Sequence, residues 1–280
     1  MREAGLSELN RAALAINLQD ALEIATVGVR RAHAFMAIGL KALEPGPLRS
    51  ASLPMAFGFR FLPDPLSDEM SAKLTAEYSS WLVGSGLREL DQYFCHFLDR
   101  VWWITAVADL HGKAVASNHV IGGKFSQDTN VARKMAKVVE RIASEKSRGD
   151  CFDAFSRARN ALGHGAGQVR QRDVIDGRSL NLRWVCPEAI IRQNGVDETF
   201  GGDGPSWEVT DPNGAEIFLK FVERTKEIPI GEKIEFSPHE LSEICFFYYQ
   251  QAIILIKALE EFLALKGIIV SSTTQDIAQT

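Results

Sequence analysis

The chain has 280 residues, a formal net charge of −5, 46% hydrophobic residues and 24% charged residues. These values are typical of an ordinary globular protein with a sizeable core. No stretch approaches the roughly 20 apolar residues of a membrane span, so an integral membrane protein is not expected. Four widely spaced cysteines, with no CxxC pair and no secretory leader before them, predict reduced thiols and a cytoplasmic location.

The first predicted element is a long helix that ends near residue 43. Apolar residues recur at helical spacing from Leu14 through Val29 and beyond. Glu44-Pro45-Gly46-Pro47 then ends the helix, because proline and glycine cannot extend it. Prolines rule out a regular helix over residues 48–65. We expect either an ordered connection or one edge strand there, with three phenylalanines against the bundle: Phe57, Phe59 and Phe61.

A second long helix is predicted from Ser67 to about Leu110. Serine is a favourable N-cap, and the two acidic residues after it suit the positive end of the helix dipole. Gly84 and Gly86 lie in its apolar stripe, so we expect a kink or a close helix crossing there. His96 lies among aromatic residues, and we interpret it as a core or interface histidine.

Positive charge is concentrated between residues 131 and 183, which contain twelve Lys and Arg against six Asp and Glu. A predicted helix, capped by Asp128 or Thr129 and running to about Lys146, carries part of this charge. Phosphate binding draws mainly on lysine and arginine, so the cluster favours a nucleic-acid partner. A solvated helix face would explain the charge equally well.

The stretch Phe155–Gly167 combines a helix end with a polar cluster. Alanine, leucine and arginine favour helix up to Leu162, and three glycines then end it, because glycine adopts the positive φ of a helix C-cap without steric cost. Asn160 and His164 are four residues apart and share a face, whereas Arg159 must reach round with its long stem. RNA cleavage by the adjacent ribose hydroxyl requires these groups: one that moves protons near neutral pH, and a cation beside the phosphorane.

The motif Arg159-Asn160-x-x-x-His164, followed by a glycine, resembles the Arg-polar-x-x-x-His signature of the HEPN superfamily of RNA-processing and defence proteins. The resemblance implies a helical bundle that pairs as a homodimer, with two motifs in one cleft that cuts RNA without a metal or another cofactor. It implies that His164 is the general base or acid, that Arg159 holds the scissile phosphate, and that Asn160 orients the histidine or the phosphate. The predicted RNA-binding residues flank the motif: Arg157, Arg170 and Arg172.

Three functions remain open from the sequence. The first is a metal-independent endoribonuclease, acting as a toxin or defence effector with an antitoxin or another protein partner. The second is a catalytically silent HEPN-like module that binds RNA, a nucleotide or a protein. The third is a structural interaction protein whose motif match is chance, with Arg159 a solvated cation and His164 a residue that suits the negative end of the helix dipole. Some family members carry a tyrosine that a partner nucleotidyltransferase modifies; Gly165-Ala166-Gly167 stand in its place, so that partner is not expected.

Residues 169–236 differ in character and predict a β-rich insertion. Leu180–Val185 alternates between apolar and polar residues, and Ala189–Arg192 is short and apolar, as expected for strands. Residues 215–226 fit either a further strand or a helix. The insertion would then separate the motif helix from the last helix.

The last predicted helix begins at Ser237-Pro238-His239-Glu240, a capping box with proline at the first helical position, and ends at Gly267. Its apolar arc is broader than one bundle face needs, and we interpret the extra width as a dimer contact. The sequence therefore predicts one mainly α domain over residues 1–280. It is a bundle of about four principal helices with a small β-rich insertion, residues 169–236, before the last helix.

Overall fold

The computed structural model describes residues 16–43, 65–111, 113, 123–144, 148–175, 177–193, 195–200 and 214–270. The first turn of the predicted N-terminal helix and the three phenylalanines of the predicted connection lie outside these ranges. Within them the chain is mainly helical, with a small antiparallel sheet before the last helix. The predicted fold class is thereby confirmed.

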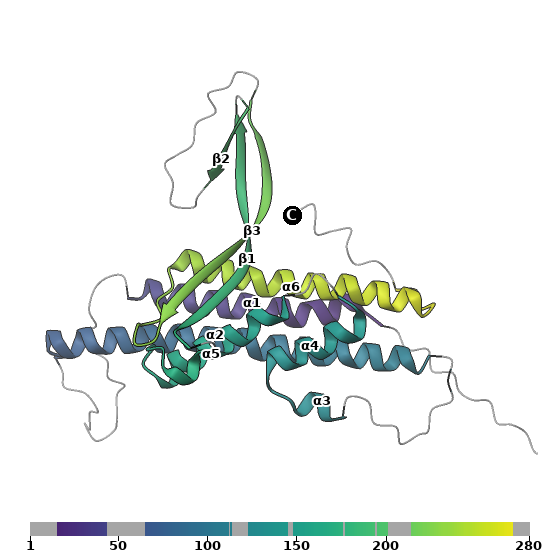
Figure 1. The fold of residues 1–280 in the computed structure, drawn as a ribbon, viewed down its shortest axis with the longest axis horizontal. Helices are drawn as coiled ribbons and strands as arrows, with labels where there is room; N and C mark the ends of the chain where they lie inside the picture. Colours follow the sequence, from purple (N-terminus) through teal and green to yellow (C-terminus); the bar gives the residue numbers. More distant parts are fainter. Residues whose placement is uncertain are drawn as a thin grey trace, which may run out of the picture.

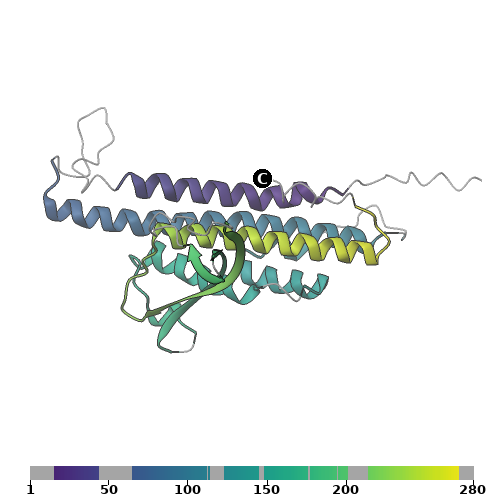
Figure 2. The same cartoon turned by 90° about the horizontal axis from the view of Figure 1, so that it is seen from above.

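Five helices of twelve residues or more build the described bundle. They are α1 (Leu18–Lys41), α2 (Asp68–Asp109), α4 (Val131–Ile142), α5 (Gly149–His164) and α6 (Pro238–Leu265); α3 (Gly123–Gln127) and the 3-10 helix η1 (Gln171–Asp173) are short. Figure 2 shows α1 on one side, α2 and α6 in the middle, and α4 with α5 on the other side. The predicted number of about four principal helices is therefore approximate: the described bundle has five, of which α4 and α5 share one layer.

Side-chain caps fix the starts of the two longest helices where the sequence predicts them. The Ser67 hydroxyl accepts a hydrogen bond from the Met70 amide at 3.2 Å at the start of α2. At the start of α6, Ser237 and Glu240 accept each other's backbone N–H groups at 3.1 and 2.7 Å, which is the predicted capping box. Each cap satisfies amide groups that have no partner inside the helix.

Helix α4 begins slightly later than predicted. Asn130 is its N-cap, and its side-chain oxygen accepts from the Arg133 amide at 2.8 Å. The Asp128 carboxylate instead accepts from the Asn130 amide and from the Arg133 guanidinium. The predicted cap at Asp128 or Thr129 is wrong because asparagine fills the position and leaves the carboxylate free to bind a cation.

The glycines of α2 mark close helix crossings. A Cβ atom on Gly86 would stand 2.4 Å from the Met36 sulfur of α1, and one on Gly84 would stand 3.0 Å from the Leu162 Cβ of α5. A Cβ on Gly86 would force the Met36 side chain to move, and one on Gly84 would be in a tight contact with Leu162, so the two glycines favour the close approach of α1 and α5 to α2. Helix α2 continues through both positions as one element.

Three antiparallel strands form the sheet, in the order β2-β1-β3: β1 (Ser179–Gln193), β2 (Val196–Phe200) and β3 (Glu216–Pro229). β1 and β3 pair along their lengths, from Ser179 opposite Pro229 to Arg192 opposite Glu216. The sequence predicted two separate strands in place of β1, and the helical alternative for residues 215–226 is wrong. β1 continues through Pro187, where only β3 pairs with it among the described residues, and proline is tolerated in a strand that is unpaired on one side.

The strands form a twisted ribbon whose base packs on the bundle and whose outer part projects away from it (Figure 1). At the base, Trp184 is buried and its indole Nε1 donates to the Glu243 carboxylate of α6 at 2.8 Å. Lys226 of β3 bonds Glu240 of α6 at 2.7 Å. We call residues 187–193 of β1, β2 and residues 216–221 of β3 the outer ribbon.

The broad apolar arc of α6 is used within the chain. This helix packs against α1, α2, α4 and β1, so its buried residues point in several directions. Neighbouring elements of the same chain cover these residues, so the width of the arc needs no dimer contact to explain it. None of the described helices is both long and apolar enough to cross a membrane.

Candidate functional site

The motif lies at the tip of α5 because the chain reverses directly after it. His164 is the last helical residue, and the amides of Gly165 and Gly167 donate to the Ala161 carbonyl at 2.7 and 3.1 Å. The cap residue Gly165 has φ −116°, so the predicted positive φ is absent there; φ values of 52° and 80° occur at Ala166 and Gly167. This tight reversal leaves the imidazole exposed at the helix tip.

All three predicted catalytic side chains line one pocket of about 550 Å³. Asn160 and His164 are exposed, whereas Arg159 is half-buried at the pocket wall. Two of the predicted RNA-binding residues, Arg157 and Arg172, line the same pocket. The fold therefore gathers an imidazole, an amide and three guanidinium groups around one space.

The Arg159 guanidinium is held on two sides by the protein. Its Nη1 donates to the Asp91 carboxylate of α2 at 2.8 Å, and its Nε and Nη2 donate to the Asn160 side-chain oxygen at 3.3 and 3.1 Å. The predicted role of Asn160, to orient the histidine or the phosphate, differs from this contact, in which Asn160 positions the arginine. A guanidinium has five N–H donors, so two remain free for an anion.

Asp91 is the buried centre of this arrangement. It is 4% exposed, and it accepts from the Tyr248 hydroxyl at 2.6 Å, from the Ser156 hydroxyl at 3.0 Å and from Arg159. Burial raises the pKa of Asp91 above its usual value, although its three donors favour the charged form. Burial beside this carboxylate also raises the pKa of Tyr248 well above its usual value. Helices α2, α5 and α6 thus meet at one satisfied carboxylate, which fixes the arginine.

The sequence contains a signal for Asp91 that motif reasoning missed. Asp91 lies within the apolar stripe of α2, next to Leu90 and between Leu87 and Phe94. A lone carboxylate in a buried stripe must find donors, so it indicates a polar network. Tyr248 gave no comparable signal, because an aromatic residue in a buried stripe is ordinary core packing.

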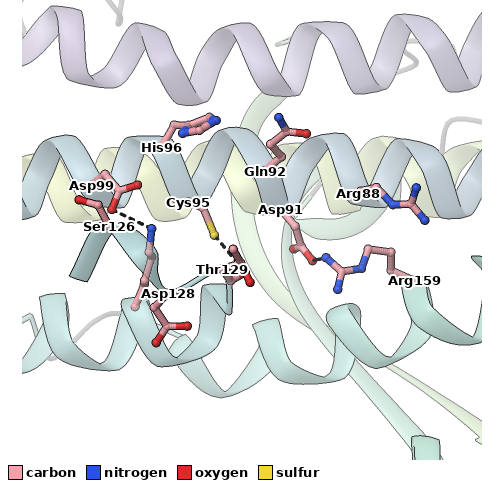
Figure 3. A pocket seen from close by; sticks show the side chains of 11 residues that line it. Arg88, Asp91, Gln92, Cys95, His96, Asp99, Ser126, Asp128, Thr129 and Arg159 are labelled. Carbon is pink, nitrogen blue, oxygen red and sulfur yellow. Dashed lines mark hydrogen bonds and ion pairs between the residues drawn. The ribbon is translucent and has the colours of Figure 1, made fainter. Parts of the chain in front are cut away.

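A second pocket of about 340 Å³ adjoins the first at Arg159, which lines both. Figure 3 shows Arg88 of α2 and Arg159 of α5 at the same end of this pocket, with the Arg159 guanidinium turned toward Asp91. The Arg88 Nη2 atom lies 3.3 Å from the place of a Cβ on Gly163, so it is beside the motif helix. Among the described residues no carboxylate pairs with Arg88. His96 is exposed and lines this pocket, so it is not a core histidine.

Comparison with known proteins adds no family to this geometry. No family model, curated protein or solved structure matches the chain. The interpretation of the site therefore depends on its own residues. In the described ranges, no group of three or more His, Cys, Asp or Glu side chains is arranged to hold a metal ion.

The cations of α4 are paired with carboxylates. Lys134 is 1% exposed, and its ammonium lies 2.7 Å from Asp99 of α2. Hydrogen bonds from Arg133 are the main reason that the pKa of Asp128 is lowered to about 2. The other ion pairs of this helix are Lys137 with Asp128 and Arg141 with Asp109. The positive charge of residues 131–144 is therefore a paired helix face and offers little free charge to phosphate.

The three predicted RNA-binding arginines differ in how free they are. Arg157 bonds Asp153 one turn earlier at 2.8 Å and also donates to the Arg172 carbonyl at 3.4 Å. The Arg172 side chain is 62% exposed, and its nearest acidic contact, with Asp173, is long at 3.9 Å. Arg170 is exposed but does not line the pocket. Arg172 is therefore the predicted RNA-binding residue best placed to meet an anion in this pocket.

Proposed function

We propose that this protein is a metal-independent endoribonuclease of the HEPN type, which cleaves RNA by attack of a ribose 2′-hydroxyl on the adjacent phosphate. The observation that carries the proposal is the shared pocket of His164, Asn160 and Arg159, with Arg157 and Arg172 on its wall. Imidazole transfers protons, and a fixed guanidinium stabilises the charge that develops on phosphorus-bound oxygens. RNA is the substrate class that supplies both the phosphate and the internal nucleophile.

The chemistry assigns each group one task. The 2′-oxygen attacks phosphorus and loses its proton to a base, and the bond from phosphorus to the 5′-oxygen breaks as that oxygen gains a proton. The products are a 2′,3′-cyclic phosphate and a 5′-hydroxyl. His164 is the base or the acid, and Arg159 holds the nonbridging oxygens with the two N–H groups that its protein contacts leave free.

A second copy of the chain completes this site in our proposal. Two proton transfers are needed, and His164 is the one histidine among the described residues that line the pocket. A homodimer that brings two motifs together would provide a base from one protomer and an acid from its partner. Arg172, exposed at the pocket wall, is then placed to contact the RNA backbone.

The test is cleavage of single-stranded RNA by the purified chain, with and without a chelator. We expect products that end in 2′,3′-cyclic phosphate, undiminished by the chelator and absent with His164→Ala or Arg159→Ala. His33→Ala and Arg30→Ala are matched controls, since both residues are exposed on α1 and lie outside the pocket. Full activity in His164→Ala, or loss of activity in the chelator, would contradict the proposal.

A second candidate function is a catalytically silent module that binds RNA. The observation that favours it is the commitment of three Arg159 N–H groups to Asp91 and Asn160. An ion pair with a buried carboxylate neutralises much of the charge that a phosphate would otherwise meet. RNA binding by the wild type, with no cleavage in any assembly state, would select this alternative; no binding and no cleavage would instead indicate a structural interaction protein.

A further inference from the structure

The outer ribbon exposes apolar side chains where the rest of the chain buries them. Ile217, Leu219 and Phe221 are 70%, 65% and 53% exposed and alternate along β3, so they project from one face of the sheet. The outer ribbon projects away from the bundle (Figure 1); Phe221, at its inner end, lies 6.4 Å between ring centroids from Phe246 of α6 and still remains 53% exposed. Aliphatic side chains gathered on one exposed face are typical of an interaction surface.

The backbone of the same strand is also open to a partner. β3 is an edge strand, and within the described part of the chain no strand pairs with its outer side. Folded proteins usually blunt such an edge with a short strand, a bulge or proline. β3 runs for 14 residues, and its only proline is the last one, Pro229. An exposed edge with an apolar face is suited to strand addition.

We infer that a second copy of this chain pairs with the outer half of β3, antiparallel about a two-fold axis at Phe218. In this register Glu216 of each copy lies opposite Lys220 of the other, so two opposite-charge pairs form. Ile217 lies opposite Leu219 twice on the exposed face. In the described structure neither Glu216 nor Lys220 is in an ion pair closer than 4.0 Å, so both charges can serve this contact.

The charges on the strand select this register. Side chains alternate between faces, and a two-fold axis perpendicular to the sheet keeps each face, so opposed residues must be an even number of positions apart. Pairing about Lys220 would set two ammonium groups against each other. Pairing about Leu219 would set Glu216 opposite Val222 and leave its charge without a partner. Of these three registers only pairing about Phe218 joins opposite charges without opposing like ones; pairing about Phe221 would set Glu216 opposite Lys226, which already bonds Glu240 of α6.

This contact is separate from the one that would join two motifs. Phe218 and Pro229 of β3 are eleven positions apart, which corresponds to roughly 35 Å of strand. The base of the ribbon is beside the motif, since the Ile234 amide donates to the Gly167 carbonyl at 2.8 Å. Two copies joined at Phe218 therefore hold their motifs far apart, at opposite ends of a continuous sheet. The inference stands whether or not the chain cleaves RNA.

Exchanging the charges of Glu216 and Lys220 tests the contact. The measurement is the molar mass that the full chain has in solution. Glu216→Lys and Lys220→Glu should each halve the mass of the wild-type assembly, and the double variant should restore it. Contacts within one chain predict the opposite, because Glu216 faces Arg192 and Lys220 faces Glu188 in the same sheet. The double variant creates two like-charge pairs there, so only pairing between copies can rescue it. Glu227→Lys makes the same charge change on β3 outside the paired segment, and should leave the mass unchanged.

Cross-linking tests the register. With Phe218→Cys, a short thiol cross-linker should join two copies, whereas Thr225→Cys on the same strand should remain unlinked. The four natural cysteines are buried and do not compete. Equal mass for the wild type and Glu216→Lys at about 100 µM, a concentration at which even micromolar contacts are populated, would overturn the inference. Failure of the double variant to recover, or linkage at Thr225→Cys but not at Phe218→Cys, would overturn it as well.

Discussion

The tip of α5 and the outer ribbon depart from ordinary folding in opposite ways. At the tip, a carboxylate is buried to 4% exposure and satisfied by donors from two helices. In the outer ribbon, aliphatic and aromatic side chains remain exposed beside an unpaired strand edge. Burying polar groups and exposing apolar ones both cost free energy in an isolated chain. The comparison teaches that the buried carboxylate finds its donors within the chain, whereas the exposed face and edge of the outer ribbon leave groups for a partner to cover.

Removing the imidazole is expected to have the largest effect. His164→Ala should lower RNA cleavage about 10²–10⁴-fold, the usual contribution of a general acid or base. The free energy of unfolding should change by less than about 0.5 kcal/mol, because the side chain is exposed. Single-turnover cleavage rates and chemical denaturation measure the two effects. A large loss of stability would show that the tip of α5 serves the fold instead of the reaction.

Neutralising the buried carboxylate should have the next largest effect on cleavage. Asp91→Asn removes the charge that holds the Arg159 guanidinium, and displacement of a positioned group by about 1 Å can cost about 10²-fold in rate. The rate at saturating RNA should fall while the affinity for RNA changes little. Glu243→Gln is the matched control, because it neutralises another buried carboxylate outside the pocket. If both variants lose activity only in proportion to their unfolded fraction, Asp91 does not position the arginine.

The hydroxyl of Tyr248 should matter for stability. Tyr248→Phe removes a hydrogen bond to a buried carboxylate, and such bonds to charged groups contribute about 2 kcal/mol. Urea denaturation of Tyr248→Phe against the half-buried Tyr249→Phe measures the difference. Equal midpoints for the two variants would mean that water or another donor replaces the hydroxyl at Asp91.

The base of the ribbon should make the stability of the fold depend on pH through Glu243. Burial alone would raise the pKa of Glu243, but hydrogen bonds from Trp184 and Cys186 and the charge of Arg224 outweigh it and lower that pKa. A folded-state pKa below the unfolded value stabilises the fold at pH above the ordinary pKa of 4.5, and this contribution is lost as the pH falls through the folded-state pKa. Glu243→Gln should therefore cost about 1 kcal/mol at neutral pH. The difference from the wild type should shrink in acid; a constant difference across pH would contradict the assignment.

A substitution on the exposed apolar face of the outer ribbon should have the smallest effect on the free energy of unfolding. Leu219→Ser should alter the free energy of unfolding by less than about 0.5 kcal/mol, because the side chain contacts solvent. Self-association measured by sedimentation should nevertheless weaken. A clear loss of stability without a change in association would show that this face is covered within the chain.

The sequence predicted the helices better than it predicted the site. Periodicity and capping residues located α2 and α6 to within a residue or two, because Ser67 and Ser237 act locally. The motif residues were found together, yet their contacts depend on Asp91 and Tyr248, which are 68 and 89 positions from Arg159 in the chain. Local patterns carry no information on which distant helix face meets the motif.

Two sequence signals, the basic cluster and the wide apolar arc of the last helix, pointed to partners outside the chain. The basic cluster of residues 131–183 favoured nucleic acid, but the cations in its α4 part meet carboxylates of α2 and of the turn before α4. The wide apolar arc of α6 suggested a dimer, but α1, α2 and β1 cover it. In both cases composition shows which groups need partners but not whether the partners belong to the same chain.

The nucleophile can be tested directly with an RNA that carries one 2′-deoxy nucleotide at a position the wild-type protein cleaves. Our account predicts that cleavage stops at the linkage that follows this nucleotide and continues at neighbouring linkages, since the attacking oxygen is missing at that one place. Cleavage at the modified position with an unchanged rate would contradict attack by the ribose hydroxyl, and with it the role that we propose for Arg159 and His164.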